Sequence, residues 1–309
     1  MRWEKGLGRI KLFKEPIPNI DGIIVHFEKT PFDIVCPHFW ELRWAFGCPF
    51  DCAYCYLQGT GRGNKNPRYR NDKKVIAAIN KAFKHEYFKK NPSIFNSGEL
   101  SDSLMNPTYM RRYVDFFETQ DKHKLLLLTK SNRIQWLTEK LRKQTIASFS
   151  LNAMEVWRKW ENRTSSPQQR IEAAKQLLES GYEVRIRIDP IFPIENWKVH
   201  YQDLVYSILS KLPSDPNRIT LGTPRGLAKT LIFAKDRSWE NIAFTENPEH
   251  TGWGRKAPES IRREIYTFFY DEFDTLGFDK TRIALCKETR SMWKELGLNW
   301  DFCRCNCIW

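Results

Sequence analysis

The chain has 309 residues, of which 41% are hydrophobic, and its formal net charge is +13. This length fits one large α/β domain with additions, and the longest conspicuous apolar run, Leu125 to Leu128, is far shorter than a membrane span. The first residues contain no apolar stretch of the signal-peptide kind, so we expect a cytoplasmic protein. In that reducing compartment clustered cysteines bind metal more readily than they form disulfides.

The high net positive charge indicates which class of partner the chain binds. A chain of this size with so high a positive charge is expected to bind a polyanion, although a basic surface can also serve solubility alone.

Strands and helices are expected to alternate through most of the chain. Six segments have the apolar or alternating pattern of strands, namely 41–46, 93–96, 124–130, 146–151, 183–189 and 218–222. Five helices are expected between them, at 72–87, 107–119, 133–143, 166–181 and 197–212. A helix at 260–276, a segment at 282–285, a last helix and a cysteine-rich tail are expected to follow.

Six strand–helix repeats predict a parallel sheet joined by crossover helices. The expected fold is therefore α/β, a partial (β/α)6 barrel of the TIM type with an N-terminal extension (1–38), a core (39–225) and a C-terminal region (226–309) that includes a lid-like insertion. In such barrels the chemistry gathers at the carboxyl ends of the strands. The chemically active residue types that fall there are Cys48, Gly98, Lys130, Ser150 and Asp189.

Three cysteines of the first strand–helix loop carry the strongest signal. Cys48, Cys52 and Cys55 follow one another with gaps of three and two residues, among glycine, proline and aromatic residues. A cubane iron–sulfur cluster takes one thiolate per iron, so three thiolates leave one iron open to a substrate. A zinc site or three packed thiols are the alternatives to this interpretation.

This spacing resembles that of the radical S-adenosylmethionine (SAM) superfamily. The resemblance implies a [4Fe–4S] cluster on the three cysteines, whose open iron chelates SAM and whose reduction yields a 5′-deoxyadenosyl radical. It also implies that the segment Asn96–Glu99 holds the SAM amino group, for which the close approach of Gly98 and the carboxylate of Glu99 are suited.

Within the superfamily the chain resembles the spore photoproduct lyase branch over roughly residues 40–225. The segments that carry the resemblance are Tyr54–Gln58, Ser101–Asp102, Thr129–Lys130, Phe149–Asn152, Thr164–Pro167, Arg170–Ala174 and Asp189–Phe192. It implies that Lys130 and Ser150 contact the SAM carboxylate and that Ser101 and Asp102 lie beside its amino end. Tyr56 is expected either to pass a hydrogen atom or to cover the cluster, and Tyr54 is expected to pack against adenine.

One position departs from that branch. The repair enzyme has a cysteine two residues before the Ser–Asp pair, where this chain has Glu99. A carboxylate does not readily give up a hydrogen atom, so the repair reaction itself is not expected here.

The tail forms a second group of cysteines, which has no equivalent that we know in the repair enzyme. Cys303, Cys305 and Cys307 alternate, so in an extended chain they would face one side, and Cys286 supplies a fourth thiol. Four ligands suit a second [4Fe–4S] cluster or a structural zinc ion, and free thiols acting as hydrogen donors or a redox pair are the other alternative. Cys36 is expected to be a lone, buried, small apolar residue.

Two segments combine basic and aromatic residues, namely Thr60–Arg70 and Lys229–Arg255, and they are expected to hold a nucleic acid unless they are solvated loops. The expected function is hydrogen abstraction from a nucleobase, thymine-derived and in DNA, with modification, rearrangement or lyase chemistry, served by an electron donor such as flavodoxin or ferredoxin. Radical modification of a peptide or small molecule is one alternative. An iron–sulfur redox sensor that binds nucleic acid is another.

Overall fold

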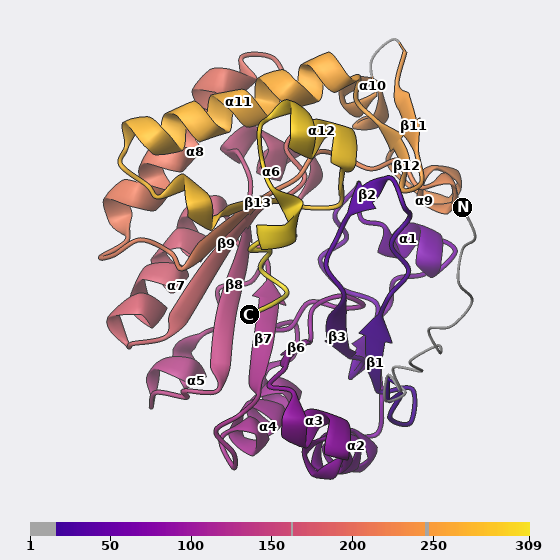
Figure 1. Cartoon of the computed structure of the whole chain (residues 1–309), viewed down its shortest axis with the longest axis vertical. Helices are drawn as coiled ribbons and strands as arrows, with labels where there is room; N and C mark the ends of the chain where they lie inside the picture. Colours follow the sequence, from indigo (N-terminus) through magenta and orange to yellow (C-terminus); the bar gives the residue numbers. More distant parts are fainter. Residues whose placement is uncertain (1–16, 162, 245–246) are drawn as a thin grey trace, which may run out of the picture.

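The computed structural model describes residues 17–161, 163–244 and 247–309, so the beginning of the predicted N-terminal extension lies outside the described residues. One curved sheet of eight strands organises this part of the chain (Figure 1). In spatial order the strands are β1 (Ile24–Phe27), β3 (Phe39–Leu42), β6 (Ile94–Asn96), β7 (Lys124–Thr129), β8 (Thr145–Leu151), β9 (Glu183–Ile188), β10 (Arg218–Leu221) and β13 (Ile283–Leu285). Only the edge pair β1–β3 is antiparallel.

The six predicted parallel strands are confirmed, and the sheet adds one strand at each edge. The first predicted strand is shorter than expected, because β3 ends at Leu42. Trp44 then turns inward, where it is fully buried and its indole Nε1 donates to the carbonyl of Ser97 at 2.8 Å. The chain continues as β4 (Ala45–Phe46), which pairs with β5 (Arg68–Tyr69) in a small separate sheet.

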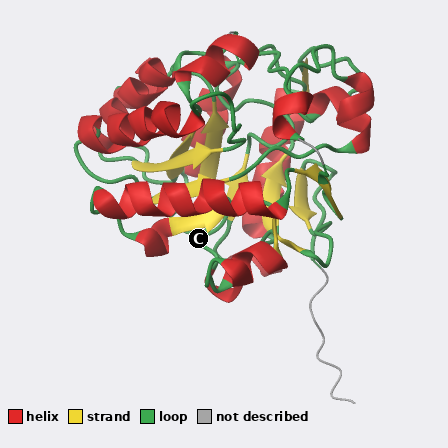
Figure 2. Cartoon of the chain, turned by 90° about the horizontal axis from the view of Figure 1, so that it is seen from above, coloured by secondary structure: helices red, strands yellow, loops and turns green. Residues whose placement is uncertain are grey.

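Helices surround the strands when the molecule is seen from above (Figure 2). Their bounds are α1 (Leu57–Thr60), α2 (Asp72–Lys84), α3 (Glu86–Lys90), α4 (Pro107–Phe117), α5 (Gln135–Thr138), α6 (Met154–Trp160), α7 (Pro167–Glu179), α8 (Trp197–Lys211), α11 (Glu259–Thr275) and α12 (Arg290–Glu295). The start of α7 is fixed by a reciprocal pair of hydrogen bonds between Ser166 and Gln169, a capping box.

The helix expected over 133–143 is wrong in length, because α5 covers only Gln135–Thr138. Side chains bond the carbonyls that a longer helix would have used for its own turns. The hydroxyl of Tyr182 donates to the carbonyls of Leu137 and Lys140, at 2.8 and 2.9 Å. The guanidinium of Arg142 donates to the carbonyls of Trp136 and Lys140. Conversely, α6 forms where no helix was expected.

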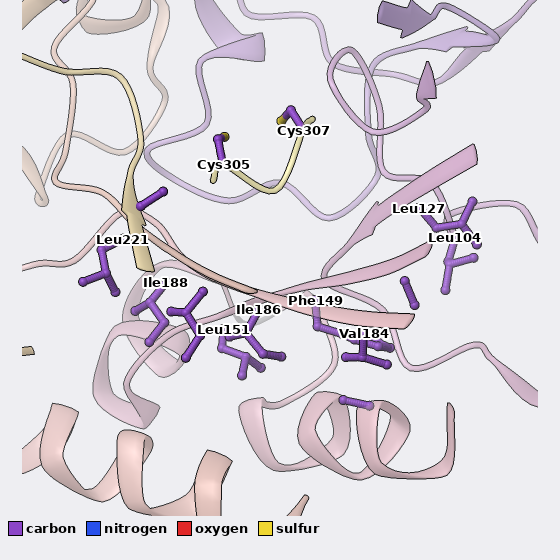
Figure 3. Packing of buried hydrophobic residues seen from close by; sticks show 14 of the residues in the cluster. Leu104, Leu127, Phe149, Leu151, Val184, Ile186, Ile188, Leu221, Cys305 and Cys307 are labelled. Carbon is purple, nitrogen blue, oxygen red and sulfur yellow. The ribbon is translucent and has the colours of Figure 1, made fainter. Parts of the chain in front are cut away.

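The period-two pattern of β9 separates the two faces of the sheet. Val184, Ile186 and Ile188 are fully buried among the outer helices, as Figure 3 shows. Arg187 and Asp189 point to the inner face, where they line a cavity. The polar side of the alternation therefore supplies the interior of the barrel rather than its solvent surface.

The C-terminal region partly rejoins the barrel. It contains α9 (Ala228–Phe233), α10 (Glu240–Ala243), a hairpin of β11 (Glu249–Thr251) and β12 (Gly254–Lys256), and two short 3-10 turns, Lys280–Arg282 and Trp300–Phe302. A further short strand, β14 (Glu288–Thr289), pairs antiparallel with β2 (Ile34–Val35). The tail ends against the inner face of the sheet (Figure 1). Among the described residues, no helix has the length and apolar character that crossing a membrane would require.

Candidate active site

A cavity of about 770 Å³ opens at the carboxyl ends of the parallel strands. Its lining contains two of the three loop cysteines, Cys52 and Cys55. The predicted site residues that also line it are Tyr54, Tyr56, Gly98, Glu99, Lys130 and Ser150. The predicted residues at the ends of four separate strands therefore converge on one space.

The cysteine loop is held in shape by its backbone. The amide of Cys48 donates to the carbonyl of Lys65 at 2.8 Å, and the amide of Ala53 donates to the carbonyl of Trp160 at 3.0 Å. Gly47 has φ +89°, and a Cβ there would lie 2.6 Å from two backbone oxygens. Only glycine fits this turn, so the loop conformation is encoded beside its first cysteine.

The loop thiols have the chemistry that an iron–sulfur cluster requires, but their side chains are not oriented toward one common point in this structure. Burial raises the pKa of the Cys52 thiol to about 12, so without metal it stays protonated. Across the described ranges, no three histidine, cysteine or acidic side chains already stand as ligands of one ion. Side-chain rotation and deprotonation would accompany metal binding, as is usual for thiolate sites. With two of the three thiols facing the cavity, the donor set fits a cluster that shares its open iron with a ligand there.

Gly98 brings the backbone close to the cavity, as its residue type predicts. A Cβ at this position would lie 2.6 Å from both the Cβ and the carbonyl oxygen of Leu128. Its amide donates to the Oδ1 of Asn96 at 2.9 Å. A side chain would therefore push β7 away from the loop.

A buried carboxylate that the sequence did not reveal anchors one wall. Glu161 is fully buried and pairs with Lys130 Nζ at 3.0 Å and with Arg170 at 2.9 Å. Tyr54 donates its hydroxyl to the same carboxylate, and Lys130 Nζ also lies 3.1 Å from that hydroxyl. Burial alone would raise the pKa of Glu161, but Lys130 and Arg170 outweigh burial and hold it at about 2. Glu161 is thus an anion that orients both Tyr54 and Lys130.

The carboxylate of Glu99, which was expected to face the amino group of SAM, faces the ammonium group of Lys287 instead. Lys287 Nζ lies 3.2 Å from its carboxylate, and the same ammonium lies within 6 Å of the ring centroids of Phe27, Tyr56 and Trp253. Burial opposes the charge of Glu99, but Lys287 and Arg187 lower its pKa. Tyr56 donates its hydroxyl to the backbone carbonyl of Glu99. The position of the missing cysteine is therefore filled by Glu99, in a half-buried ion pair whose ammonium lies near three aromatic rings.

Ser101 and Asp102 lie outside the cavity lining. Asp102 accepts hydrogen bonds from the hydroxyl of Thr129 and the amide of Lys130, both at 2.7 Å, and from the amide of Leu104 at 2.9 Å. It ties the loop after β6 to the end of β7, and so it fixes the backbone that carries Lys130.

The floor of the cavity is charged. Asp189 accepts two hydrogen bonds from Arg225, at 2.8 and 2.9 Å, and Arg187 lies 3.8 Å away. Leu227, Trp239 and Trp253 complete the lining, and all three belong to the predicted lid-like insertion. That insertion therefore covers part of the cavity.

The first basic segment is not wholly exposed. Lys65 is buried, and its ammonium lies 2.9 Å from Asp51 inside the cysteine loop. Arg62, Arg68 and Arg70 are exposed. The segment thus supports the cysteine loop with one cation and leaves three arginines available to solvent.

The tail cysteines lie inside the barrel, and Cys36 joins them. Cys286, Cys303, Cys305 and Cys307 are buried. Both Cys286 and Cys307 contribute to the raised pKa of Cys36, after the larger effect of burial. The expectation that Cys36 stands alone is wrong, because β2 and β14 pair across the barrel mouth and bring it to Cys286.

Residues 24–223 match a family model described as "Spore photoproduct lyase". The spore photoproduct lyase of Bacillus subtilis is 31% identical to the chain over 262 residues, which cover 76% of this chain and 73% of that protein. The enzyme of Clostridium acetobutylicum is 29% identical over 178 residues, so the chain spans about half, 52%, of its length.

A solved structure, "Spore photoproduct lyase complexed with dinucleoside spore photoproduct", superposes with a TM-score of 0.66 at 20% identity. The alignment covers 80% of this chain and 75% of the other. It shows the common fold, a partial TIM barrel with a central parallel sheet. The residues matched by the family model end before Cys286, and the comparisons do not support a second cluster in the tail.

Proposed function

This chain belongs to the spore photoproduct lyase family, and we propose that it is a radical SAM enzyme that abstracts hydrogen from a nucleobase in DNA. The observation that carries the proposal is the convergence of Cys52, Cys55, Tyr54, Lys130 and Ser150 on one cavity of about 770 Å³. A volume of this order suits a cofactor together with part of a substrate.

Cys48, Cys52 and Cys55 would hold a [4Fe–4S] cluster whose open iron takes SAM. When bound and reduced, this pair supplies a 5′-deoxyadenosyl radical and methionine. The remaining work belongs to the protein, which binds the cofactor, orients the substrate and keeps water out.

Lys130 and Ser150 are proposed to bind the SAM carboxylate. Lys130 lines the cavity at the end of β7, and its partner Glu161 holds the ammonium in place at 3.0 Å. A charge-assisted hydrogen bond in such a dry site is strong. Gly98 and Glu99 remain candidates for the amino end of SAM, and Tyr54, held by Glu161, for the adenine. Ser101 and Asp102 are proposed to act on SAM only through the loop that they brace.

A nucleobase is the proposed substrate because the outer part of the cavity offers aromatic faces. Trp253 lines it beside Tyr56, and every base has a face that can stack on such rings. A base must leave its helix to reach this depth. The dinucleoside spore photoproduct bound by one structural relative is consistent with this class of substrate.

Repair of spore photoproduct is not proposed, because Glu99 and Lys287 occupy the position of the donor cysteine. Tyr56 is a candidate to pass a hydrogen atom, since its hydroxyl meets the carbonyl of Glu99 at the cavity wall. We therefore propose that the thymine-derived product differs from that of the repair reaction.

We further propose a cytoplasmic setting, with flavodoxin or ferredoxin as electron donor. We also propose a second metal centre in the tail, for which the sequence suggests Cys286, Cys303, Cys305 and Cys307 as ligands. The cytoplasmic setting rests on the eight cysteines, which are free thiols. Peptide modification and redox sensing stay as the alternatives that the experiment below must separate.

The test is product analysis under anaerobic conditions with SAM and dithionite. The reduced enzyme should form 5′-deoxyadenosine and methionine, and DNA should increase the yield. Cys52→Ala should remove this activity while the far-ultraviolet spectrum stays unchanged, since the ligand lies on a loop. A normal yield from Cys52→Ala would refute the cluster assignment, and a yield raised by peptide but not by DNA would favour the peptide alternative.

A further inference from the structure

Five of the eight cysteines lie together inside the barrel, apart from the loop that holds Cys48, Cys52 and Cys55. Cys286 follows β13, and three more lie in the tail that reaches the inner face of the sheet. Cys36 follows β2 and is half-buried. Their convergence comes from three segments that are distant in the sequence.

The pairing of β2 with β14 brings the first two together. Val35 lies opposite Glu288, so the next residue, Cys36, faces Lys287 and neighbours Cys286. The hydroxyl of Thr30 donates to the carbonyl of Cys36 at 3.1 Å, and the amide of Cys286 donates to the carbonyl of Leu221 at 2.6 Å. Both thiols are thus carried by fixed backbone.

Buried hydrogen bonds hold the tail. The Asn306 side chain bonds the Thr220 hydroxyl at 2.8 Å, the Ser148 hydroxyl at 3.1 Å and the carbonyl of Ile186 at 2.9 Å. Arg185 donates to the carbonyls of Asn306 and Ile308, each at 2.7 Å. Figure 3 shows Cys305 and Cys307 on the side of the sheet away from the helices.

Arg187 connects two of the thiols. Its guanidinium lies 3.1 Å from the Sγ of Cys307 and 3.6 Å from the Sγ of Cys286, and its Nε has no hydrogen-bond partner among the described residues. The Nδ2 of Asn96 also lies 3.7 Å from the Cys307 sulfur. A neutral thiol is a weak acceptor, whereas a metal-bound thiolate is a strong one. The donors around Cys307 therefore suit a charged sulfur.

The local charge balance points the same way. Arg187, which is buried, and the half-buried Arg225 and Lys287 bring three cations, and their carboxylate partners Asp189 and Glu99 bring two anions, which leaves one positive charge. A Zn²⁺ ion or an oxidised [4Fe–4S] core held by four thiolates carries about two negative charges. Such a centre would offset this positive charge and leave about one negative charge.

Geometry relates three of the four thiols. Cys36 lies beside Cys286 across the pairing of β2 with β14, and Arg187 reaches the sulfurs of Cys286 and Cys307. After burial, the charges of Cys36, Cys286 and Cys307 contribute to raising the pKa of Cys303 to about 12. Cys286 and Cys307 act in the same way on Cys36. The backbone carbonyl of the remaining cysteine, Cys305, is held by Arg218 at 3.1 Å.

We propose that Cys36, Cys286, Cys303 and Cys307 ligate one metal centre, a closed [4Fe–4S] cluster or a zinc ion, beneath the active-site cavity, with Arg187 between the two. This revises the ligand set expected from the sequence, with Cys36 in place of Cys305. It deepens the second centre proposed above. Like the loop cysteines, the four thiols would close round the metal by side-chain rotation, since no ligand group stands preformed in the described parts of the chain.

The experiment removes the first cluster and counts what remains. Chain carrying Cys48→Ala, Cys52→Ala and Cys55→Ala is reconstituted anaerobically, and iron, sulfide and zinc are measured per chain. About four irons or about one zinc should remain, and the metal found identifies the centre. A folded triple variant that binds neither metal would overturn the proposal. Since this chain already lacks the loop ligands, the result is independent of SAM cleavage.

Two further substitutions in the same background separate the ligand sets. Cys36→Ser should remove the remaining metal, and Cys305→Ser should keep it. Val35→Ala serves as the matched control, because it removes packing from the same strand and should leave the metal in place. Metal retained by Cys36→Ser and lost by Cys305→Ser would overturn the assignment of Cys36.

A ligand-preserving variant covers the case in which Cys36→Ser does not fold. Cys36→His keeps a ligating side chain, so it should retain the metal with an altered absorption or electron paramagnetic resonance spectrum, read after exchange of zinc for cobalt if zinc is the metal. A spectrum identical to that of the parent would show that residue 36 is not a ligand, and the proposal would fall.

Discussion

At the scale of single residues, Glu161 and Glu99 set the electrostatics of the cavity, and each is paired with a lysine. Lys130 is the predicted contact of the SAM carboxylate, and its partner is a carboxylate that no sequence motif marked. Lys287 directly follows Cys286 in the sequence. That adjacency was the only sequence signal that the lysine lies near a site.

Lys130→Ala should weaken SAM binding by roughly ten- to a hundredfold, about 1.5–3 kcal/mol, because a charged hydrogen bond disappears and Glu161 is left facing the cofactor. Titration calorimetry on the reconstituted protein measures this. Lys198→Ala is the control, since that lysine is exposed and pairs with Glu264 on the outer helices. An unchanged dissociation constant for Lys130→Ala would mean that the lysine serves Glu161 alone.

Glu161 should make the stability of the chain depend on acid. Its pKa falls from 4.5 to about 2 on folding, so its ion pairs stabilise the fold fully above about pH 4.5 and lose their effect as the pH falls towards 2. Their contribution is on the order of 3 kcal/mol. Glu161→Gln should therefore be less stable than the parent at pH 7, with the difference narrowing below pH 4.5. Denaturant unfolding of metal-free protein at several pH values checks this, and a gap that stays constant with pH would contradict it.

Glu99 leads to a negative prediction. The reduced enzyme should not convert dinucleoside spore photoproduct efficiently to two thymines, because an ion pair replaces the hydrogen donor. Chromatography of the reaction products, with a spore photoproduct lyase as positive control, decides the matter. Efficient conversion would show that another group supplies the hydrogen atom.

At the scale of secondary structure elements, the tail, residues 303–309, lies across the inner face of the barrel and is called the strap below. Asn306 is fully buried and bonds residues of β8, β9 and β10. These hydrogen bonds join the last residues of the chain to strands that lie far earlier in the sequence.

Asn306→Ala should cost about 1–3 kcal/mol of stability, because the partners of its amide are left unpaired in a dry interior. It should also make the tail cysteines react faster with a thiol reagent in metal-free protein. The exposed Asn241→Ala provides the comparison. Equal reactivity of the tail in both variants would indicate that the metal alone, and not Asn306, holds the strap.

The periodic elements were predictable, whereas the irregular ones were not. Alternating or continuous apolar runs located the six strands of the predicted strand–helix repeat, and Ser166 with its proline located the start of α7. The predicted helix over 133–143 was too long because side chains bond the carbonyls of this segment. Tyr182 does so from a distant part of the sequence, and Arg142 does so through its own guanidinium, and neither contact is visible in the local apolar pattern. The strap and the pairing of β2 with β14 depend on interactions between distant segments, for which one sequence carries no periodic signal.

The same distinction applies to the site. Cys52, Cys55, Gly98 and Lys130 follow strand ends, and topology alone brings strand ends together. Glu161 lies after a helix that was not predicted, and Cys36 lies in the loop-rich first part of the chain. Their roles emerge only when burial and ion pairs are known.

At the scale of the whole molecule, the charge of +13 should make DNA binding strongly dependent on salt. Replacing the exposed Arg62, Arg68 and Arg70 by alanine should weaken binding and flatten the dependence of log K on log salt by about 0.7–0.9 for each phosphate that the variant no longer neutralises. Fluorescence anisotropy at several salt concentrations measures it. Replacing three exposed cations of the outer face, Lys211, Arg263 and Lys280, provides the charge-matched control, and equal effects of the two triplets would indicate binding by net charge alone.

The central claim is that the enzyme abstracts hydrogen from a base of DNA, in the cavity lined by the cysteine loop and the strand ends. The most direct measurement uses DNA with perdeuterated thymine, SAM and dithionite, followed by mass analysis of the 5′-deoxyadenosine formed. The account predicts that deuterium enters 5′-deoxyadenosine with this DNA and that Cys52→Ala forms none of the product. Abundant 5′-deoxyadenosine that never carries deuterium from any deuterated base would contradict it.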